Sequence, residues 1–193
     1  LLSDRGDSRM LGLEALSVLT DVTKTTEAMA KPIARATILG KMDSAHSTSV
    51  SDTRLQERIL SLALADIPIE ADETHKRQDH LALLIFANAV DLLDSKDVSG
   101  FVATFHFSTG VPLEHHLLTR IGQAESSPHF AYLAARILGV VCRKGEEVFP
   151  VVDEKVLMKA QMIGTCSHAA LQKEVGELLN TMAFQHSLKV VSN

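Results

Sequence analysis

Apolar residues recur along much of this chain at intervals of three and four, the spacing of one face of an α-helix. Short polar stretches separate these stripes. No sustained alternation of apolar and polar residues occurs, and no Asn-Gly or Asp-Gly pair marks a β-hairpin. The pattern predicts an all-α protein.

The first two predicted helices occupy residues 8–22 and 27–40. Asp7 or Ser8 would cap the first, and Pro32 would either kink the second or lie in its first turn. The residues expected to face the core are Leu13, Leu16, Leu19 and Val22 in the first helix and Met29, Ile33, Ala36 and Leu39 in the second.

A Ser/Thr-rich stretch without apolar periodicity follows at residues 41–53, where we expect a mobile loop. Asp52 or Thr53 would then cap a helix over residues 54–67. Residues 75–93 form the most apolar predicted helix, and we expect it at the centre of the core.

The middle of the chain has a less regular pattern. Residues 94–100 predict a turn, and residues 101–107 have the aromatic and β-branched content of a strand. Because no partner strand is available, we expect a short helix there. A further helix would follow within residues 108–122, capped by Ser108 or Thr109.

The stretch from Ser127 to Ala183 predicts three helices, of which the third repeats the apolar pattern of the first. With Ile137 placed over Val175, the matched pairs are Ala131 with Ala169, Leu133 with Leu171, and Val140 and Val141 with Leu178 and Leu179. A helix of different character, within residues 146–163, lies between them. This order is typical of stacked helical repeats.

Residues 108–143 carry a Gly-Val followed by a Leu-Leu helix, a polar turn with Ser-Pro, and a helix rich in small residues. Residues 146–183 repeat this order, and residues 8–40 show it again. The chain thereby resembles the armadillo/HEAT class of helical repeats. The anchor positions Leu16, Leu60, Val90, Ile137 and Val175 are separated by 44, 30, 47 and 38 residues, against a family period of about 40.

The resemblance implies an α-solenoid, with an irregular multi-helix bundle as the alternative. Residues 1–193 would form a single all-α repeat domain. Because Leu1 and Leu2 look like the end of a preceding apolar helix, we expect an excised fragment of a longer chain.

Composition narrows the partners and the compartment. The formal net charge of −5 argues against nucleic-acid binding, because phosphate contacts need a basic face. No apolar run is long enough for membrane insertion, and the first residues lack a signal peptide's pattern. Cys142 and Cys166 belong to no CxxC pair and are expected to be reduced thiols of an intracellular protein of the cytoplasm or nucleus.

Members of the armadillo/HEAT class are binding scaffolds, so the resemblance implies a groove that holds a peptide or a helix of a partner protein. Three pairs of basic residues, each four apart and on one helical face, would line it: Lys31 with Arg35, His116 with Arg120, and Lys155 with Lys159. An ordinary solvated face is the alternative. The Asn and Trp ladders of transport receptors are missing, since the chain has no Trp.

Enzyme signatures are absent: no P-loop, GxGxxG, HExxH or GxSxG motif occurs. Neighbouring histidines on a helix, such as His115 and His116, point about 100° apart and do not share a metal easily. We therefore predict a non-enzymatic scaffold with no metal and no cofactor. The alternative is a structural or homo-oligomerising subunit that assembles through exposed apolar ends or the Leu/Ile-rich helix at residues 79–93.

Overall fold

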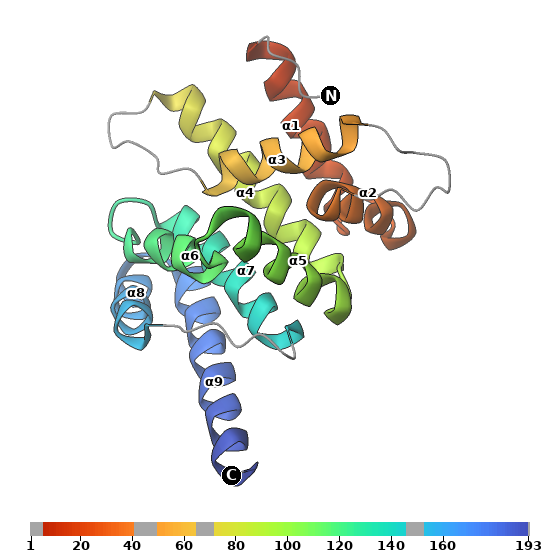
Figure 1. The fold of residues 1–193 in the computed structure, drawn as a ribbon. Coiled ribbons are helices and arrows are strands. Elements are labelled where there is room, and N and C mark those ends of the chain that lie inside the picture. Colours follow the sequence, from red (N-terminus) through yellow and green to blue (C-terminus); the bar gives the residue numbers. More distant parts are fainter. Residues whose placement is uncertain (1–5, 41–49, 65–71, 146–152, 193) are drawn as a thin grey trace. The chain divides into compact units, whose positions relative to one another are not determined.

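The computed structural model describes residues 6–40, 50–64, 72–145 and 153–192. In these ranges every regular element is an α-helix and no strand occurs, which confirms the all-α prediction (Figure 1). The helices are α1 (Gly6–Leu19), α2 (Glu27–Leu39), α3 (Val50–Leu64), α4 (Glu73–Leu92), α5 (Ser95–Thr109), α6 (Leu113–Gly122), α7 (Pro128–Lys144), α8 (Glu154–Ser167) and α9 (Ala169–Ser192).

The chain divides into two compact units, Leu1–Leu93 (unit 1) and Asp94–Asn193 (unit 2). The expectation of one repeat domain over residues 1–193 stays a prediction. Residues 41–49 of the expected loop at residues 41–53 lie outside the described residues. Its last part is wrong, because residues 50–53 are the first turn of α3.

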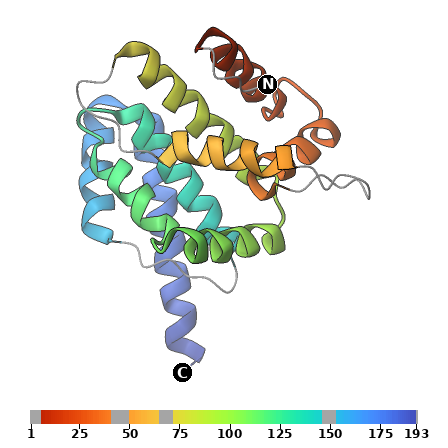
Figure 2. The same cartoon turned by 45° about the horizontal axis from the view of Figure 1, so that its top comes forward.

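Helix α4 is the centre of unit 1, where α1, α2 and α3 all pack against it (Figure 2). The Asp72 carboxylate caps it by accepting a hydrogen bond of 2.8 Å from the backbone N–H of His75. Its fully buried apolar side chains are Ala82, Leu83, Ile85, Phe86, Ala87, Ala89 and Val90. The prediction of a core helix at residues 75–93 is confirmed.

Helix α2 buries a different face from the predicted one. Met29 is 57% exposed, and the residues buried in α2 are Ala30, Ala34, Thr37 and Ile38. Small side chains dominate this face and let α2 approach its neighbours α4 and α3 closely. Pro32 lies inside the helix, which excludes a place in its first turn.

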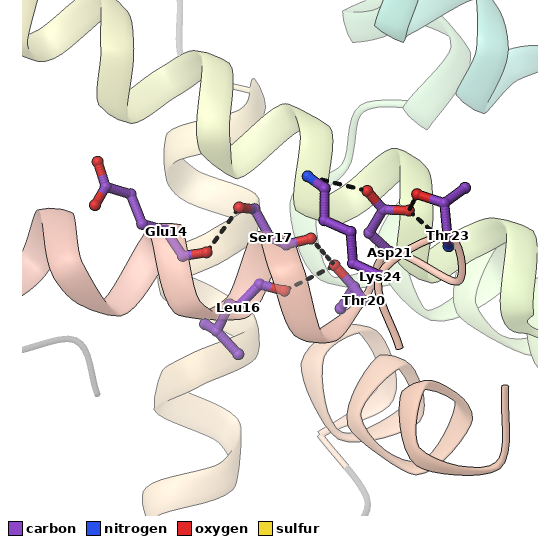
Figure 3. Close-up of polar contacts among 7 residues, drawn as sticks. All are labelled: Glu14, Leu16, Ser17, Thr20, Asp21, Thr23 and Lys24. Atoms are coloured by element: carbon purple, nitrogen blue, oxygen red, sulfur yellow. Dashed lines mark hydrogen bonds and ion pairs between the residues drawn. The ribbon is translucent and has the colours of Figure 1, made fainter. Parts of the chain in front are cut away.

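The connection from α1 to α2 is a turn that satisfies its own polar groups (Figure 3). Asp21 accepts hydrogen bonds from the backbone N–H of Thr23 (2.9 Å) and from its hydroxyl (2.7 Å), and Lys24 lies 3.3 Å away. The Thr23 hydrogen bonds, with a smaller contribution from Lys24, lower the pKa of Asp21. The turn ends α1 at Leu19, so the predicted helical position of Val22 is wrong.

Unit 2 begins with a helix where the sequence predicts a turn. The Asp94 carboxylate caps α5 by accepting from the backbone N–H of Asp97 at 2.8 Å, and Val98 and Phe101 are buried one and two turns later. Residues 95–100 are therefore helical. The short helix expected at residues 101–107 is confirmed as the later part of α5.

Helix α6 begins later than predicted. Ser108 and Thr109 are the last residues of α5, and Pro112 occupies the N-cap position of α6. Between the two helices, Gly110 adopts the left-handed conformation, with φ +69°. The predicted end of α6 at Gly122 is confirmed.

The last four helices of unit 2 pack in a defined order. Helix α6 contacts α7 and α8, and α9 contacts the same two helices. The order around this group is therefore α6, α7, α9, α8. Helices α6 and α7 form one hairpin, α8 and α9 form a second, and the two hairpins lie next to each other. Helix α5 packs against α7 and α6 at one side.

Helices α7 and α9 lie side by side and run in the same direction (Figure 1). His129 near the start of α7 contacts His168 just before α9, and further along both helices Gly139 lies beside Glu174. Both contacts join residues 35 to 39 apart. The matched positions Ile137 and Val175 are both fully buried.

Two glycines of unit 2 should respond in opposite ways to replacement by alanine. A Cβ at Gly100, inside α5, or at Gly110, just after it, would meet no atom within 4 Å. They differ in backbone conformation, because only Gly110 has a positive φ. We expect Gly100→Ala to raise the free energy of unfolding by about 0.5–1 kcal/mol and Gly110→Ala to lower it by about 1 kcal/mol.

Urea denaturation followed by circular dichroism measures both changes. Because neither alanine would touch a neighbour, equal effects of the two variants would contradict the backbone assignment at Gly110.

Candidate functional site

One side of α8 is exposed and combines positive charge with apolar side chains. This surface, called here the α8 face, consists of Lys155, Met158, Lys159 and Met162, spaced three and four residues apart. Met158 is 58% exposed and Met162 72%. Leu157, on the opposite side of α8, is fully buried and holds the helix in unit 2.

The start of α8 is fixed by a local cap. The carboxylate of Asp153 accepts a hydrogen bond of 2.9 Å from the backbone N–H of Lys155, and its backbone carbonyl accepts one from Val156. The neighbouring helix α6 supports the same turn, since Gly122 would place a Cβ 3.8 Å from the Val156 side chain. The α8 face is thus built on a supported helix and not on a loop.

The Lys159 ammonium forms an ion pair with the carboxylate of Glu125, with 3.7 Å between the two atoms. Both side chains are largely exposed. Glu125 belongs to the connection between α6 and α7. A carboxylate therefore already approaches the α8 face from within the chain.

The second predicted basic pair, on α6, lies in a different environment. Arg120 is 3% exposed, and its guanidinium lies over the ring of Phe130 at 5.5 Å from the centroid. His116 is half-buried, and its ring forms a T-shaped contact with Phe105 at 5.9 Å between centroids. In this structure both residues pack inside unit 2, and neither projects as far into solvent as Lys155 or Lys159.

The remaining predicted pair, Lys31 and Arg35, lies on α2 in unit 1, and both residues are half-buried. The structure thus brings His116, Arg120, Lys155 and Lys159 into one unit, on the adjacent helices α6 and α8. A basic ladder that joins all three pairs stays a prediction.

Sequence reasoning missed the two methionines of the α8 face. Within residues 154–163, the part of α8 whose burial the structure describes, only Leu157 and Ala160 are buried. The useful indication was the sequence KVLMKAQM, in which each methionine follows a lysine by three residues. Phe107, on α5, was missed in the same way and is 91% exposed.

A pair of histidines ties the beginning of α9 to that of α7. The backbone N–H of Leu171 donates to Nδ1 of His168 at 3.2 Å, so His168 caps α9. The proton of the neutral His168 ring then lies on Nε2, which faces Nδ1 of His129 at 3.3 Å. A metal ion on Nε2 would need the proton on Nδ1 and would break the cap.

Removal of the His168 cap should be measurable. We expect His168→Ala to lower the free energy of unfolding by about 1 kcal/mol, since it leaves the first turn of α9 without its side-chain acceptor. His168→Asn keeps an acceptor at the N-cap and is the matched control, expected to lose less. Urea titrations of both variants test this, and equal losses would show that the cap contributes nothing.

Cysteine chemistry is suppressed at Cys142. The thiol is buried on α7, and burial raises its pKa to about 12. A thiol in that state is neither a nucleophile nor a metal ligand at neutral pH. In the described ranges no three His, Cys, Asp or Glu side chains are grouped so that they would hold a metal ion.

None of the helices in the described part of the chain has both the length and the apolar character needed to cross a lipid bilayer. No family model, curated protein or solved structure matches the chain.

Proposed function

We propose that this protein is a non-enzymatic interaction scaffold that binds a peptide or helix of a partner protein on the α8 face. The observation that carries the proposal is the exposure of Met158 and Met162 between Lys155 and Lys159. Large apolar side chains on a rigid exposed helix are typical of binding surfaces, and methionine adapts to varied partners. Of the predicted basic residues, Lys155 and Lys159 contribute most to this surface.

The packing of unit 2 supports a repeat-type scaffold. In a stack of helical hairpins, first helices contact first helices and second helices contact second helices. The pairs α6 with α8 and α7 with α9 follow this rule, and α7 and α9 are parallel. We propose that α6–α7 and α8–α9 are two successive HEAT-like hairpins. Unit 1, in which α4 contacts three helices, departs from that arrangement.

Charge reversal on the α8 face tests the proposed function. We expect Lys155→Glu with Lys159→Glu to reduce capture of the native partner about tenfold, because two attractive charges become repulsive. The melting temperature should stay unchanged, since both side chains are exposed. Quantitative pull-down from the native cell, with the wild-type chain as reference, measures the loss.

The matched control is Lys96→Glu with Lys173→Glu, which changes the same charge at exposed positions on α5 and α9 of unit 2. If both double variants lose the partner equally, the effect comes from net charge and not from the α8 face. If neither loses it, the proposed site is wrong.

Assembly is the second candidate function, through exposed apolar residues of α1 and not through the helix at residues 79–93. The apolar side chains of residues 79–93 are mostly buried, so they offer little surface to another chain. Leu11 and Val18, seven residues apart on one side of α1, are exposed instead. Light scattering of the wild type and of Leu11→Ser with Val18→Ser would detect an oligomer formed through α1.

A further inference from the structure

We infer that the segment bound on the α8 face is an acidic amphipathic helix, whose apolar residues cover Met158 and Met162 and whose carboxylates pair with Lys155 and Lys159. This inference rests on the proposed function and specifies the chemistry of its partner. It is carried by the charge of the α8 face, by the spacing of its residues and by the contact with Glu125.

Charge complementarity favours an acidic partner. The α8 face presents two ammonium groups, four residues apart and both exposed, on a chain whose net charge is −5. These ammonium groups are the positive charges of the face, although the carboxylate of Glu125 lies beside one of them and those of Asp153 and Glu154 lie at the start of the same helix. The face would attract a segment with carboxylates and repel a basic one.

Glu125 shows which group fits beside Lys159. Its carboxylate lies 3.7 Å from the ammonium, at the side of the face that borders the connection between α6 and α7. An incoming carboxylate would replace Glu125 at the same ammonium. Glu125 is therefore a weak intramolecular competitor, because exposed ion pairs contribute little and exchange easily.

Spacing favours a helix over an extended strand. Met158 and Met162, and likewise Lys155 and Lys159, are one helical turn apart, about 6 Å along α8. A partner helix that lies along α8 presents residues i and i+4 at the same interval, so each turn meets one methionine and one lysine. An extended strand repeats its side chains on one face every 6.5–7 Å, roughly two residues, which is slightly longer than the interval along α8.

The test uses the full 193-residue chain and four designed helical peptides of equal length. The first carries Leu at i and i+4 flanked by Glu. In the second Gln replaces Glu, in the third Lys replaces Glu, and in the fourth Ser replaces Leu.

Binding is followed through the ¹³C-methyl signals of methionine, with Met158 and Met162 assigned from Met→Leu variants. Met29 on α2 is the control, since it is exposed to the same degree as Met158 but lies in unit 1.

We expect the acidic peptide to shift the Met158 and Met162 signals without shifting Met29. The Gln and Ser peptides should bind at least about fivefold more weakly, and the Lys peptide should not bind. Glu125→Gln should tighten binding of the acidic peptide about two- to fivefold, because it frees Lys159. Lys159→Ala should weaken it.

The outcomes separate this inference from the proposed function. If the Gln or Lys peptide shifts Met158 and Met162 as strongly as the acidic one, the face binds helices but the acidic chemistry is wrong. If none of the four peptides shifts these signals while the double charge reversal still abolishes partner capture, the helical partner is wrong and the scaffold function stands. If partner capture is also unaffected, both proposals fail. Concentration-dependent shifts without peptide would show that a second copy of the chain occupies the face.

Discussion

Replacement of Phe86 by alanine is expected to lower the free energy of unfolding by about 3–5 kcal/mol. Phe86 lies on α4, with no solvent exposure, at the centre of unit 1. The change removes the transfer free energy of a whole aromatic ring and leaves a cavity among helices that contact α4 from several sides. Calorimetry or urea titration of the variant measures the loss.

Phe107→Ala is the matched control, because Phe107 is 91% exposed on α5. It removes the same atoms without opening a cavity, so its effect should stay within about 0.5 kcal/mol. A loss at Phe86 no larger than that at Phe107 would mean that α4 is not the centre of the core. Since the two residues lie in different units, each variant should be followed through a probe in its own unit.

The second large effect concerns the reactivity of Cys142. Because burial raises the pKa of this thiol to about 12 from an ordinary value of 9.0, the thiolate fraction at pH 8 falls about a thousandfold. Only the thiolate reacts with iodoacetamide. We expect the native chain to be alkylated at Cys142 at least about a thousand times more slowly than the unfolded chain.

The measurement is made on a Cys166→Ser background, so that Cys142 is the one thiol left. Alkylation in concentrated urea gives the reference rate. Burial of this thiol also makes the stability of the fold depend on pH. The unfolded chain loses the thiol proton near pH 9, whereas the folded chain keeps it. The free energy of unfolding therefore falls as pH rises above about 9. Rapid alkylation of native protein would contradict the burial of Cys142.

Much of unit 2 could be predicted from apolar spacing, because neighbouring parallel helices bury equivalent positions. Ile137 and Val175 match in the sequence, and both are buried where α7 and α9 lie side by side. The helix at residues 75–93 could be predicted for a simpler reason. Its apolar residues lie on most sides of the helix, and such a helix is stable only in the core.

Other features depend on tertiary contacts that a local pattern does not contain. On α2 the buried positions include Ala30 and Ala34, because close helix packing favours small side chains over the larger Met29. At residues 95–100 the polar composition suggested a turn, but the Asp94 cap and burial of Val98 favour the helix.

In the candidate site, too, some features follow from the local sequence and others depend on tertiary contacts. The pairing of Lys155 with Lys159 on one face follows from helical geometry alone. The burial of Arg120 does not, because it depends on the ring of Phe130 across the α6–α7 hairpin. The exposure of Met158 is likewise a property of the packed unit, since methionine is as suited to a core as to a binding surface.

The pairing of α7 with α9 has a consequence for synthesis of the chain. Helix α7 leaves the ribosome before its cover is complete, since α9, one of the helices that pack against it, is separated from it in sequence by the whole of α8. At roughly 5–20 residues per second, that interval lasts a few seconds. During this time α7 depends on α5 and α6 for cover, and the side that α9 later covers stays exposed.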